Sequence, residues 1–409
     1  MRAVVFDLSI PKFALAKGLG RWAPGLYYGP VSCLKLREVA PPTLRGPAWA
    51  RIQVDLAGVC GSDLALITFH YSTALEPFNS FPSVLGHEIF GRVVEAGPEA
   101  GVKEGDRVAI EPLLGCAVRG FDPPCARCAA GEPGLCGRVT DGDIGPGVML
   151  GFCASLPGGW SETVVAHRSQ LVKVPAAVPD QAAVMIEPLS VGVHAALKRP
   201  ARAGEKVLVI GGGMISFAVL SALALLESPG ETTHMALFAH QADLGKKLGA
   251  HRSITPGAGP LDDQVEAATG ARRYKPIVGD TTFVGGYDVV YDCVGTQRSF
   301  GQALRYARPG GTVVLVGCLS QLARFDMTMV WAHELTVAGV YTYGTERAPT
   351  RRTFELTVER LASTKLPVGD IVTHRFELDD YREAIVANIE RERYQSVKTV
   401  FDNRNRRVS

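Results

Sequence analysis

The first part of the chain alternates short apolar, mostly β-branched runs with glycine and proline. Such runs occupy residues 50–59, 91–97, 106–112 and 161–167. Runs of this kind, bounded by turn residues, are typical of strands joined by loops. The pattern predicts an all-β region with many loops up to about residue 180.

After residue 180 the pattern changes. Apolar runs typical of buried strands lie at 206–213, 234–240, 287–295 and 311–317, with helical stretches at 217–226, 242–250 and 299–307. Strands that alternate with helices indicate a parallel sheet with crossover helices. Residues 373–388 return to a mixed character and predict a strand followed by a helix.

One apolar stretch has the length of a membrane span. Residues 207–226 contain no charged side chain over 20 residues, and about 20 apolar residues cross a bilayer as a helix. Three consecutive glycines interrupt this stretch after its first apolar run. We therefore expect a buried strand, a tight turn and a buried helix instead of a span.

Length and charge narrow the class of protein. A chain of 409 residues exceeds what one hydrophobic core usually supports, so two domains are expected. The 46% apolar and 21% charged fractions are ordinary for a globular protein, and a net charge of +2 gives no case for a nucleic-acid partner. Charges are scattered through the first apolar residues, so we expect no signal peptide, a cytoplasmic location and no membrane partner.

Four of the nine cysteines lie between positions 116 and 136. Without a secretory context they are expected to be reduced thiols. Four thiolates on a loop rich in proline and glycine favour a closed tetrahedral zinc site, with a redox pair or disulfides as the alternatives. The residues are Cys116, Cys125, Cys128 and Cys136.

A glycine-rich turn follows the apolar run at 206–210. Gly211, Gly213 and Ser216 occupy the three small positions of a dinucleotide-binding turn between a strand and a helix. No carboxylate and no arginine stands at the end of the next expected strand, where Ala239, His240 or Gln241 is a candidate to face the ribose. The choice between NAD and NADP therefore stays open.

A second set of possible metal ligands is spread over three short motifs. Cys60 lies in GVCGSD, His87 and Glu88 lie in GHE, and Glu187 lies in IEP. A thiolate, an imidazole and a carboxylate together bind zinc while leaving a position for water or substrate.

The order of these motifs resembles the zinc-dependent medium-chain alcohol dehydrogenases, with the sorbitol and threonine dehydrogenase branch most similar. The resemblance runs from GVCGSD through the four-cysteine loop and VLVIGGG to YDVVYDCVG and THRFELDD, nearly the whole chain. It implies an α/β plus β fold: a GroES-like β-barrel catalytic domain with a Rossmann domain, a doubly wound parallel sheet. The implied domains are 1–185 (catalytic), 186–342 (NAD(P)-binding) and 343–409, a segment that returns to the catalytic domain.

The resemblance also implies roles for single residues. Cys60, His87 and Glu88 would bind the catalytic zinc, with Glu187 as a fourth ligand or the holder of its water. Asp63 would orient the His87 ring. Ser62 would contact the alcohol oxygen and begin a proton relay. The four clustered cysteines would hold a structural zinc.

Three features depart from the family pattern. Eight residues separate Cys116 from Cys125, where the common spacing is two, so Cys116 is the least secure ligand. Ala65 stands where many relatives place a relay histidine. Ser216 replaces the third glycine of the turn, and the usual acidic residue at the ribose is missing.

Together these observations predict a zinc-dependent oxidoreductase that transfers hydride between a secondary alcohol or polyol and NAD(P), with a preference for NAD. An NADPH-dependent zinc aldehyde or ketone reductase is the alternative enzyme, and a nucleotide-binding regulatory protein is the alternative without catalysis. The resemblance further implies a homo-oligomer, either a dimer or a tetramer.

Overall fold

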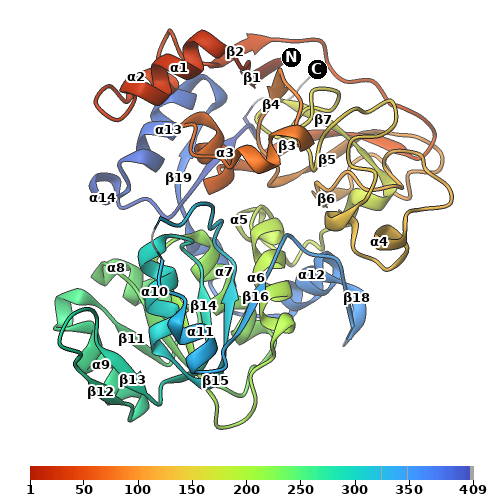
Figure 1. Cartoon of the computed structure of the whole chain (residues 1–409). Helices are drawn as coiled ribbons and strands as arrows, with labels where there is room; N and C mark the ends of the chain where they lie inside the picture. The colour runs from red at the N-terminus through yellow and green to blue at the C-terminus, as the bar shows by residue number, and fades with distance from the viewer. Residues whose placement is uncertain (324, 348, 406–409) are drawn as a thin grey trace. The chain divides into compact units, whose positions relative to one another are not determined.

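The computed structural model describes residues 1–323, 325–347 and 349–405. They form two compact units. Unit 1 contains Met1–Glu187 and the chain from Val372 onward, and unit 2 contains Pro188–Ile371. The chain thus leaves its first unit once and later returns to it (Figure 1).

Unit 1 is built on a seven-stranded, mostly antiparallel sheet. Its central strand β3 (Trp49–Gly58) pairs with three neighbours, β5, β7 and β20. The β3 side chains of Ile52, Val54 and Leu56 are fully buried. The remaining strands of the main sheet are β5 (Ile89–Ala96), β6 (Arg107–Ile110), β7 (Thr163–His167), β8 (Leu171–Lys173), β19 (Val372–Phe376) and β20 (Lys398–Asp402).

A smaller sheet and several helices complete unit 1. The small sheet has the order β2 (Leu34–Glu38), β1 (Arg2–Phe6) and β4 (Ser83–Val84). The purely all-β expectation for the first part of the chain is wrong, because that part also forms helices, beginning directly after β1. The helices of unit 1 are α1 (Ile10–Leu19), α2 (Gly25–Tyr28), α3 (Gly61–Ile67), α4 (Ala126–Ala129), α5 (Asp180–Ala183), α13 (Tyr381–Ile389) and α14 (Arg391–Tyr394).

Unit 2 contains the predicted parallel sheet, of six strands in the order β11-β10-β9-β14-β15-β16. Counted along the chain within the sheet this is the doubly wound order 3-2-1-4-5-6. The order reverses between the neighbours β9 and β14, which places the turn after β9 at the usual position of a ligand. The strands are β9 (Lys206–Ile210), β10 (Glu231–Met235), β11 (Arg252–Ile254), β14 (Tyr287–Asp292), β15 (Ala307–Leu315) and β16 (Thr336–Gly339).

Helices and two hairpins complete unit 2. The helices are α6 (Ile186–Lys198), which begins at the unit boundary, α7 (Met214–Leu225), α8 (Ala239–Lys247), α9 (Leu261–Thr269), α10 (Gln297–Tyr306), α11 (Thr328–Ala332) and α12 (Thr353–Ser363). The hairpins pair β12 (Arg272–Tyr274) with β13 (Thr282–Val284), and β17 (Thr345–Arg347) with β18 (Thr350–Arg352).

The uncharged stretch 207–226 forms β9, the glycine turn and α7, as predicted. Nine of the twelve α7 residues are buried, which explains why this helix is apolar on every side. No helix in the described part of the chain is long and apolar enough to cross a membrane.

The strand expected at 234–240 lies earlier, at Glu231–Met235. Its buried residues include the polar Thr232, Thr233 and His234, which hide the strand from an apolar pattern. The apolar residues after it, including Leu237 at 65% exposure, belong to the loop before α8. The apolar pattern therefore led us to expect a strand over residues that form the loop between β10 and α8.

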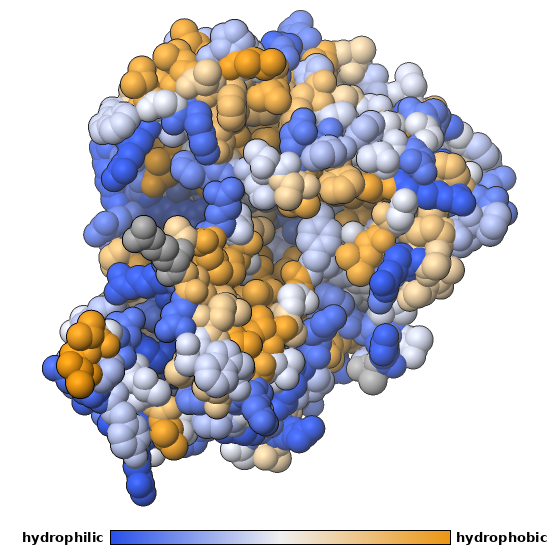
Figure 2. Space-filling model, viewed as in Figure 1, coloured by the Kyte–Doolittle hydropathy of each residue, from blue (hydrophilic) through white to orange (hydrophobic). Residues whose placement is uncertain are grey.

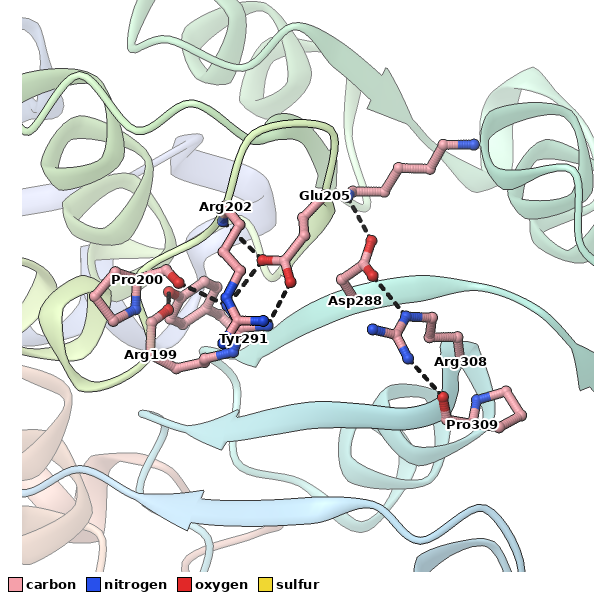
Figure 3. Close-up of polar contacts among 9 residues, drawn as sticks. Arg199, Pro200, Arg202, Glu205, Asp288, Tyr291, Arg308 and Pro309 are labelled. Carbon is pink, nitrogen blue, oxygen red and sulfur yellow. Dashed lines mark hydrogen bonds and ion pairs between the residues drawn. The ribbon is translucent and has the colours of Figure 1, made fainter.

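Ion pairs fix the first residues of the two central strands. Arg199 donates two hydrogen bonds to the Glu205 carboxylate (Figure 3). The Nη–O distances are 2.6 and 2.8 Å. Asp288 accepts a hydrogen bond from the Lys206 backbone N–H at 2.7 Å and pairs with Arg308 at 2.5 Å. The hydrogen bond to Arg199 lowers the pKa of Glu205 to about 2. These contacts set where β9 and β14 begin, at the end of the strands away from the glycine turn.

A buried histidine supports the glycine turn from the neighbouring strand. The His234 ring donates a hydrogen bond from Nε2 to the Gly211 carbonyl at 2.6 Å and packs edge-on against Phe217 of α7. Its Nδ1 has no hydrogen-bond partner among the described residues and faces Gly245, where any Cβ would overlap the ring. Burial lowers the pKa of His234 to about 4. The ring is therefore neutral at pH 7 and carries its proton on Nε2.

The buried, neutral His234 should make the stability of unit 2 depend on pH. Its folded pKa lies below the ordinary value of about 6.5, so its contribution is complete above pH ~6.5 and decreases as the pH falls toward ~4. Between pH 7 and pH 5 the expected loss is about 2 kcal/mol. Urea unfolding of the wild type and His234→Gln at both pH values measures it, because glutamine can donate the same bond without titrating. Equal losses in the two proteins would contradict the assignment.

Candidate active site

The first candidate ligand, Cys60, ends the loop after β3 and caps helix α3. Its backbone N–H donates to Asp63 Oδ2 at 2.9 Å, so the carboxylate closes the first turn of the helix. Asp63 is fully buried. The short GVCGSD motif therefore fixes both the thiol and a negative charge within one helical turn.

His87 and Glu88 lie in the loop between β4 and β5. Gly86 precedes them with φ of +90°, a left-handed conformation, and a Cβ at this position would overlap the Trp160 ring. This close packing requires glycine and directs the next two side chains inward, where His87 is 4% and Glu88 1% exposed. The His87 Nδ1 atom lies 3.5 Å from Asp63 Oδ1.

The structure brings three of the four predicted ligands together. One ligand atom from each of Cys60, His87 and Glu88 lies within 4.8 Å of the others. Glu187, at the start of α6, is buried but is not part of this group. Three of the predicted residues therefore form the group, and the role of Glu187, as a fourth ligand or as the holder of the zinc-bound water, stays a prediction.

The charge of this group suits a divalent cation. Although burial alone lowers the pKa of His87, the Asp63 carboxylate and the Cys60 thiol hold it well above its usual value. The site thus attracts positive charge strongly. One oxygen of Glu88, Oε1, has no hydrogen-bond partner among the described residues, so it has an acceptor to offer. A thiolate, an imidazole and a carboxylate so placed fit zinc with an open coordination position.

Lys398 belongs to this site and was missed in the sequence. It lies on β20, is 1% exposed, and forms an ion pair with Glu88 Oε2. Its ammonium group also donates to the Val59 carbonyl at 2.9 Å. A buried lysine is rare unless it is paired. The available signal was a single lysine inside the apolar run VKTVF, a charge in a strand that otherwise looks buried.

Aromatic rings close one side of His87. The Phe152 ring centroid lies 5.7 Å from that of His87, and Tyr71 stacks on Phe152 at 5.9 Å. Ser62, the predicted proton acceptor, lies at the start of α3 and is half-buried. Ala65 lies one turn further along the same helix.

The four clustered cysteines have the geometry of a tetrahedral metal site. Their sulfur atoms lie within 4.8 Å of one another, and Cys136 Sγ is 3.7 Å from Cys116 Sγ and 3.9 Å from Cys125 Sγ. A tetrahedron with zinc–sulfur bonds of about 2.3 Å places sulfurs about 3.8 Å apart. All four are free cysteines, and these separations are far from a disulfide bond of about 2.05 Å. Backbone N–H groups of Cys128 and Gly137 lower the pKa of Cys125 to about 6, which favours the thiolate.

The insertion between Cys116 and Cys125 is held by one buried arginine. Arg119, 5% exposed, donates only to backbone carbonyls, with Nε to Leu114 at 2.9 Å and Nη2 to Gly147 at 2.8 Å. Its Nη1 donates to the carbonyls of Asp141 and Gly145 at 2.7 and 2.8 Å. The extra residues loop out as expected, and Arg119 ties them to the following loop. Cys116 keeps its place in the cluster.

The dinucleotide turn connects β9 to α7 as predicted. Gly211 has φ of +131°, and Gly213 is the N-cap residue of α7. Ser216 is fully buried and donates from its hydroxyl to the Gly213 carbonyl at 2.7 Å. The serine therefore replaces glycine without facing the ligand side of the turn. The N–H groups at the start of α7 remain suited to a phosphate.

At the next strand end, Gln241 packs closer to the turn than His240. The His240 ring stacks on Phe238, with centroids 5.7 Å apart. Gln241 folds back over Gly212, and its Oε1 accepts from the backbone N–H groups of Leu237 and Phe238. Gln241 was one of the three candidates that the sequence offered for the ribose, and that role stays a prediction. Lys246 lies on the same helix, 4.0 Å from Asp243.

Comparison with known proteins agrees with this geometry. The family described as "Alcohol dehydrogenase GroES-like domain" matches residues 46–176, and "Zinc-binding dehydrogenase" matches residues 218–363. L-idonate 5-dehydrogenase from Vitis vinifera is 30% identical over 354 residues, 85% of each chain. Sorbitol dehydrogenase from Arabidopsis thaliana is 29% identical, over 85% of this chain and 86% of the relative.

The fold also matches solved structures. A protein assigned as a zinc-binding dehydrogenase from Sinorhizobium meliloti, bound to NADP, superposes with a TM-score of 0.72 at 24% identity, over 98% of both chains. The GroES-like and Rossmann architecture implied by the resemblance is therefore confirmed. The chain belongs to the zinc-dependent medium-chain alcohol dehydrogenase family, and it is a zinc-containing, NAD(P)-dependent oxidoreductase.

Proposed function

We propose that this enzyme oxidises a secondary alcohol or polyol to a ketone, or catalyses the reverse reaction, at a zinc ion held by Cys60, His87 and Glu88. The observation that carries the proposal is the approach of these three ligand atoms to within 4.8 Å of one another in a buried, negatively charged site. The names of the two relatives, sorbitol dehydrogenase and L-idonate 5-dehydrogenase, support the alcohol class.

When bound, zinc would supply Lewis acidity toward the substrate oxygen and lower the pKa of the hydroxyl. The chain's own residues keep that position available. Asp63 orients the His87 ring through Nδ1, at 3.5 Å. Lys398 holds one oxygen of Glu88 and leaves the other for the metal. The Phe152 ring packs against His87, with ring centroids 5.7 Å apart.

Oxidation of the alcohol requires that the substrate lose a hydroxyl proton and a hydride. Ser62, two residues after Cys60, is the group we assign to accept the proton. Ala65 cannot accept a proton, so the proton would continue from Ser62 through water or the ribose. A bound nicotinamide would supply the redox chemistry as the acceptor of the hydride. Glu187 stays a candidate, either as a fourth ligand or as the holder of the zinc-bound water.

For the structural site, we propose that Cys116, Cys125, Cys128 and Cys136 bind a second zinc ion. Four ligands close the coordination sphere, so this ion has no open position for substrate. A bound ion would stabilise the loop that Arg119 also holds through its hydrogen bonds to backbone carbonyls.

For the nucleotide, we propose binding at the turn that contains Gly211, Gly213 and Ser216, with Ser216 supporting the turn from within α7, and a preference for NAD. A 2′-phosphate usually needs a fixed cation near the second strand end. The residues there are His240 and Gln241, and Lys246 lies further along α8 beside Asp243. The predicted domains 1–185, 186–342 and 343–409, the homo-oligomer and the cytoplasmic location also remain proposals.

Two ligand sets predict two zinc ions per chain. Elemental analysis of protein purified without chelators should give about two, and Cys125→Ser should reduce this to about one. Cys318→Ser is the matched control, since that exposed thiol belongs to neither set. A content near one that Cys125→Ser leaves unchanged would remove the structural ion from this account.

Loss of a catalytic ligand should separate chemistry from nucleotide binding. His87→Ala should bring turnover below detection while NAD binding, followed by fluorescence, persists, because the glycine turn lies in unit 2. Ser62→Ala should lower kcat roughly a hundredfold or more with zinc content unchanged, since it removes a proton acceptor but no ligand. His374→Ala, outside the metal group, serves as control. Near-normal kcat in His87→Ala would refute the zinc mechanism.

Cofactor preference follows from the charges near the ribose. We expect KM for NAD to be roughly tenfold lower than for NADP, equivalent to ~1.4 kcal/mol. Gln241→Glu should widen the preference, because a carboxylate accepts from the ribose hydroxyls and repels a phosphate. Steady-state KM values for both nucleotides at fixed ionic strength measure this. A preference for NADP that His240→Ala or Lys246→Ala abolishes would show that the ribose pocket is assigned wrongly.

A further inference from the structure

The connection between the first two strands is far longer than its geometry requires. β1 and β2 are antiparallel neighbours, with Phe6 opposite Leu34, so residues 7–33 form the connection. Hairpins of this kind usually need only about two to five residues. Here the connection folds into α1 and α2, and it precedes the first family match, which starts at residue 46. We call residues 8–31 the N-terminal insertion.

The N-terminal insertion exposes an unusual amount of apolar surface. Within α1 only Ala16 is buried, although six of its ten residues are apolar. Figure 2 shows hydrophobic colouring over the region where Figure 1 places α1 and α2. A helix that is apolar but unburied normally belongs against another apolar phase. Large exposed side chains of the insertion are Leu8 39%, Ile10 80%, Phe13 38%, Leu15 43%, Leu19 52%, Trp22 76% and Val31 55%.

This surface is fixed to the body of unit 1. Lys17 Nζ donates to the Phe69 carbonyl at 2.6 Å, and the Phe13 ring packs edge-on against Phe69 at 5.0 Å. The buried Ala16 lies on the same helix, between these two anchoring residues. Four of the exposed side chains therefore lie on a helix that is held against unit 1, and the other three lie in the segments on either side of it.

The charge of the insertion selects an anionic partner. From Leu8 to Leu34 the chain contains Lys12, Lys17 and Arg21 and no acidic residue. Other cations lie near the insertion. The pKa of Lys35 is lowered first by burial and then by the positive charges of Lys12, Arg382 and Arg37. The nearby carboxylate of Asp7 is paired with Arg37 at 2.7 Å.

Arg382 also links the insertion to helix α13. It lines an open pocket of about 580 Å³ together with Tyr28 and Pro30, residues at and just after α2. Glu383 is the one acidic residue on this pocket, and Tyr394 closes it from α14. Arg382 and Glu383 are the charged residues on this pocket, so their charges offset each other and the positive charge of the surface comes from the insertion itself.

We propose that the N-terminal insertion is a peripheral docking surface for an anionic lipid bilayer. Leucine, isoleucine, phenylalanine and tryptophan with interspersed lysine and arginine are the composition of helices that lie in the membrane interface. The apolar side chains would enter the headgroup boundary, and the cations would pair with anionic headgroups. A protein partner of opposite charge would have to supply a matching apolar face, whereas a bilayer supplies both features. This departs from the expectation of no membrane partner, which considered spanning segments only.

Vesicle sedimentation of the full chain tests the proposal. We expect binding to vesicles of phosphatidylcholine with about 30% phosphatidylserine, and far weaker binding to phosphatidylcholine alone, with high salt reducing the first. Lys12→Gln with Arg21→Gln should weaken binding on the order of twentyfold, since each cation near such a surface contributes roughly fivefold. Trp22→Ser should weaken it as well.

Trp331→Ser is the matched control, because Trp331 is 73% exposed on α11 of unit 2, close to the 76% of Trp22. It should bind vesicles as the wild type does. Dehydrogenase activity without vesicles should be unchanged in all three variants, which shows that they are folded. No binding to anionic vesicles at low salt would overturn the proposal. Equal binding to both vesicle types would also overturn it. So would a dimer that forms without lipid in sedimentation velocity and that Trp22→Ser dissociates.

Discussion

Compensation of buried negative charge is the constraint on which the site of unit 1 depends. Asp63 and Glu88 are both essentially removed from water, and the Cys60 thiol lies beside them. Taking a carboxylate out of water costs several kcal/mol unless a positive group meets it. Lys398 meets one oxygen of Glu88, the Cys60 backbone N–H meets one oxygen of Asp63, and His87 lies against the other. What remains uncompensated is what a divalent cation would neutralise.

The backbone of unit 1 makes that charge cluster possible. Gly58 leaves room for Glu88, since a Cβ there would overlap the carboxylate, and Gly86 leaves room for Trp160. Trp160 in turn donates from Nε1 to the Gly58 carbonyl at 2.9 Å. Packing therefore requires glycine at positions 58 and 86, close to the ligands Cys60 and His87.

Unit 2 meets a different requirement, a backbone turn that can approach a phosphate closely. His234 holds the Gly211 carbonyl from the neighbouring strand, and Ser216 holds that of Gly213 from within the helix. Both side chains bind backbone oxygens on the protein side of the turn. They stabilise the turn without occupying its ligand side. This support requires a polar residue, His234, inside strand β10, where the hydropathy pattern would lead one to expect an apolar residue.

The sequence by itself determined the alternation of strands and helices after residue 180, the glycine turn and the two groups of metal ligands, because local periodicity and short motifs encode these features. Tertiary structure decided the rest. Only the fold brings Lys398 to Glu88 and leaves Glu187 outside the metal group, since neither separation along the chain carries distance information. Strand β10 begins at Glu231, earlier than the sequence predicted, because its buried polar residues are stabilised by partners that a hydropathy pattern does not show. Tertiary structure likewise left the apolar residues of α1 exposed, since whether an apolar helix is covered depends on its neighbours in space.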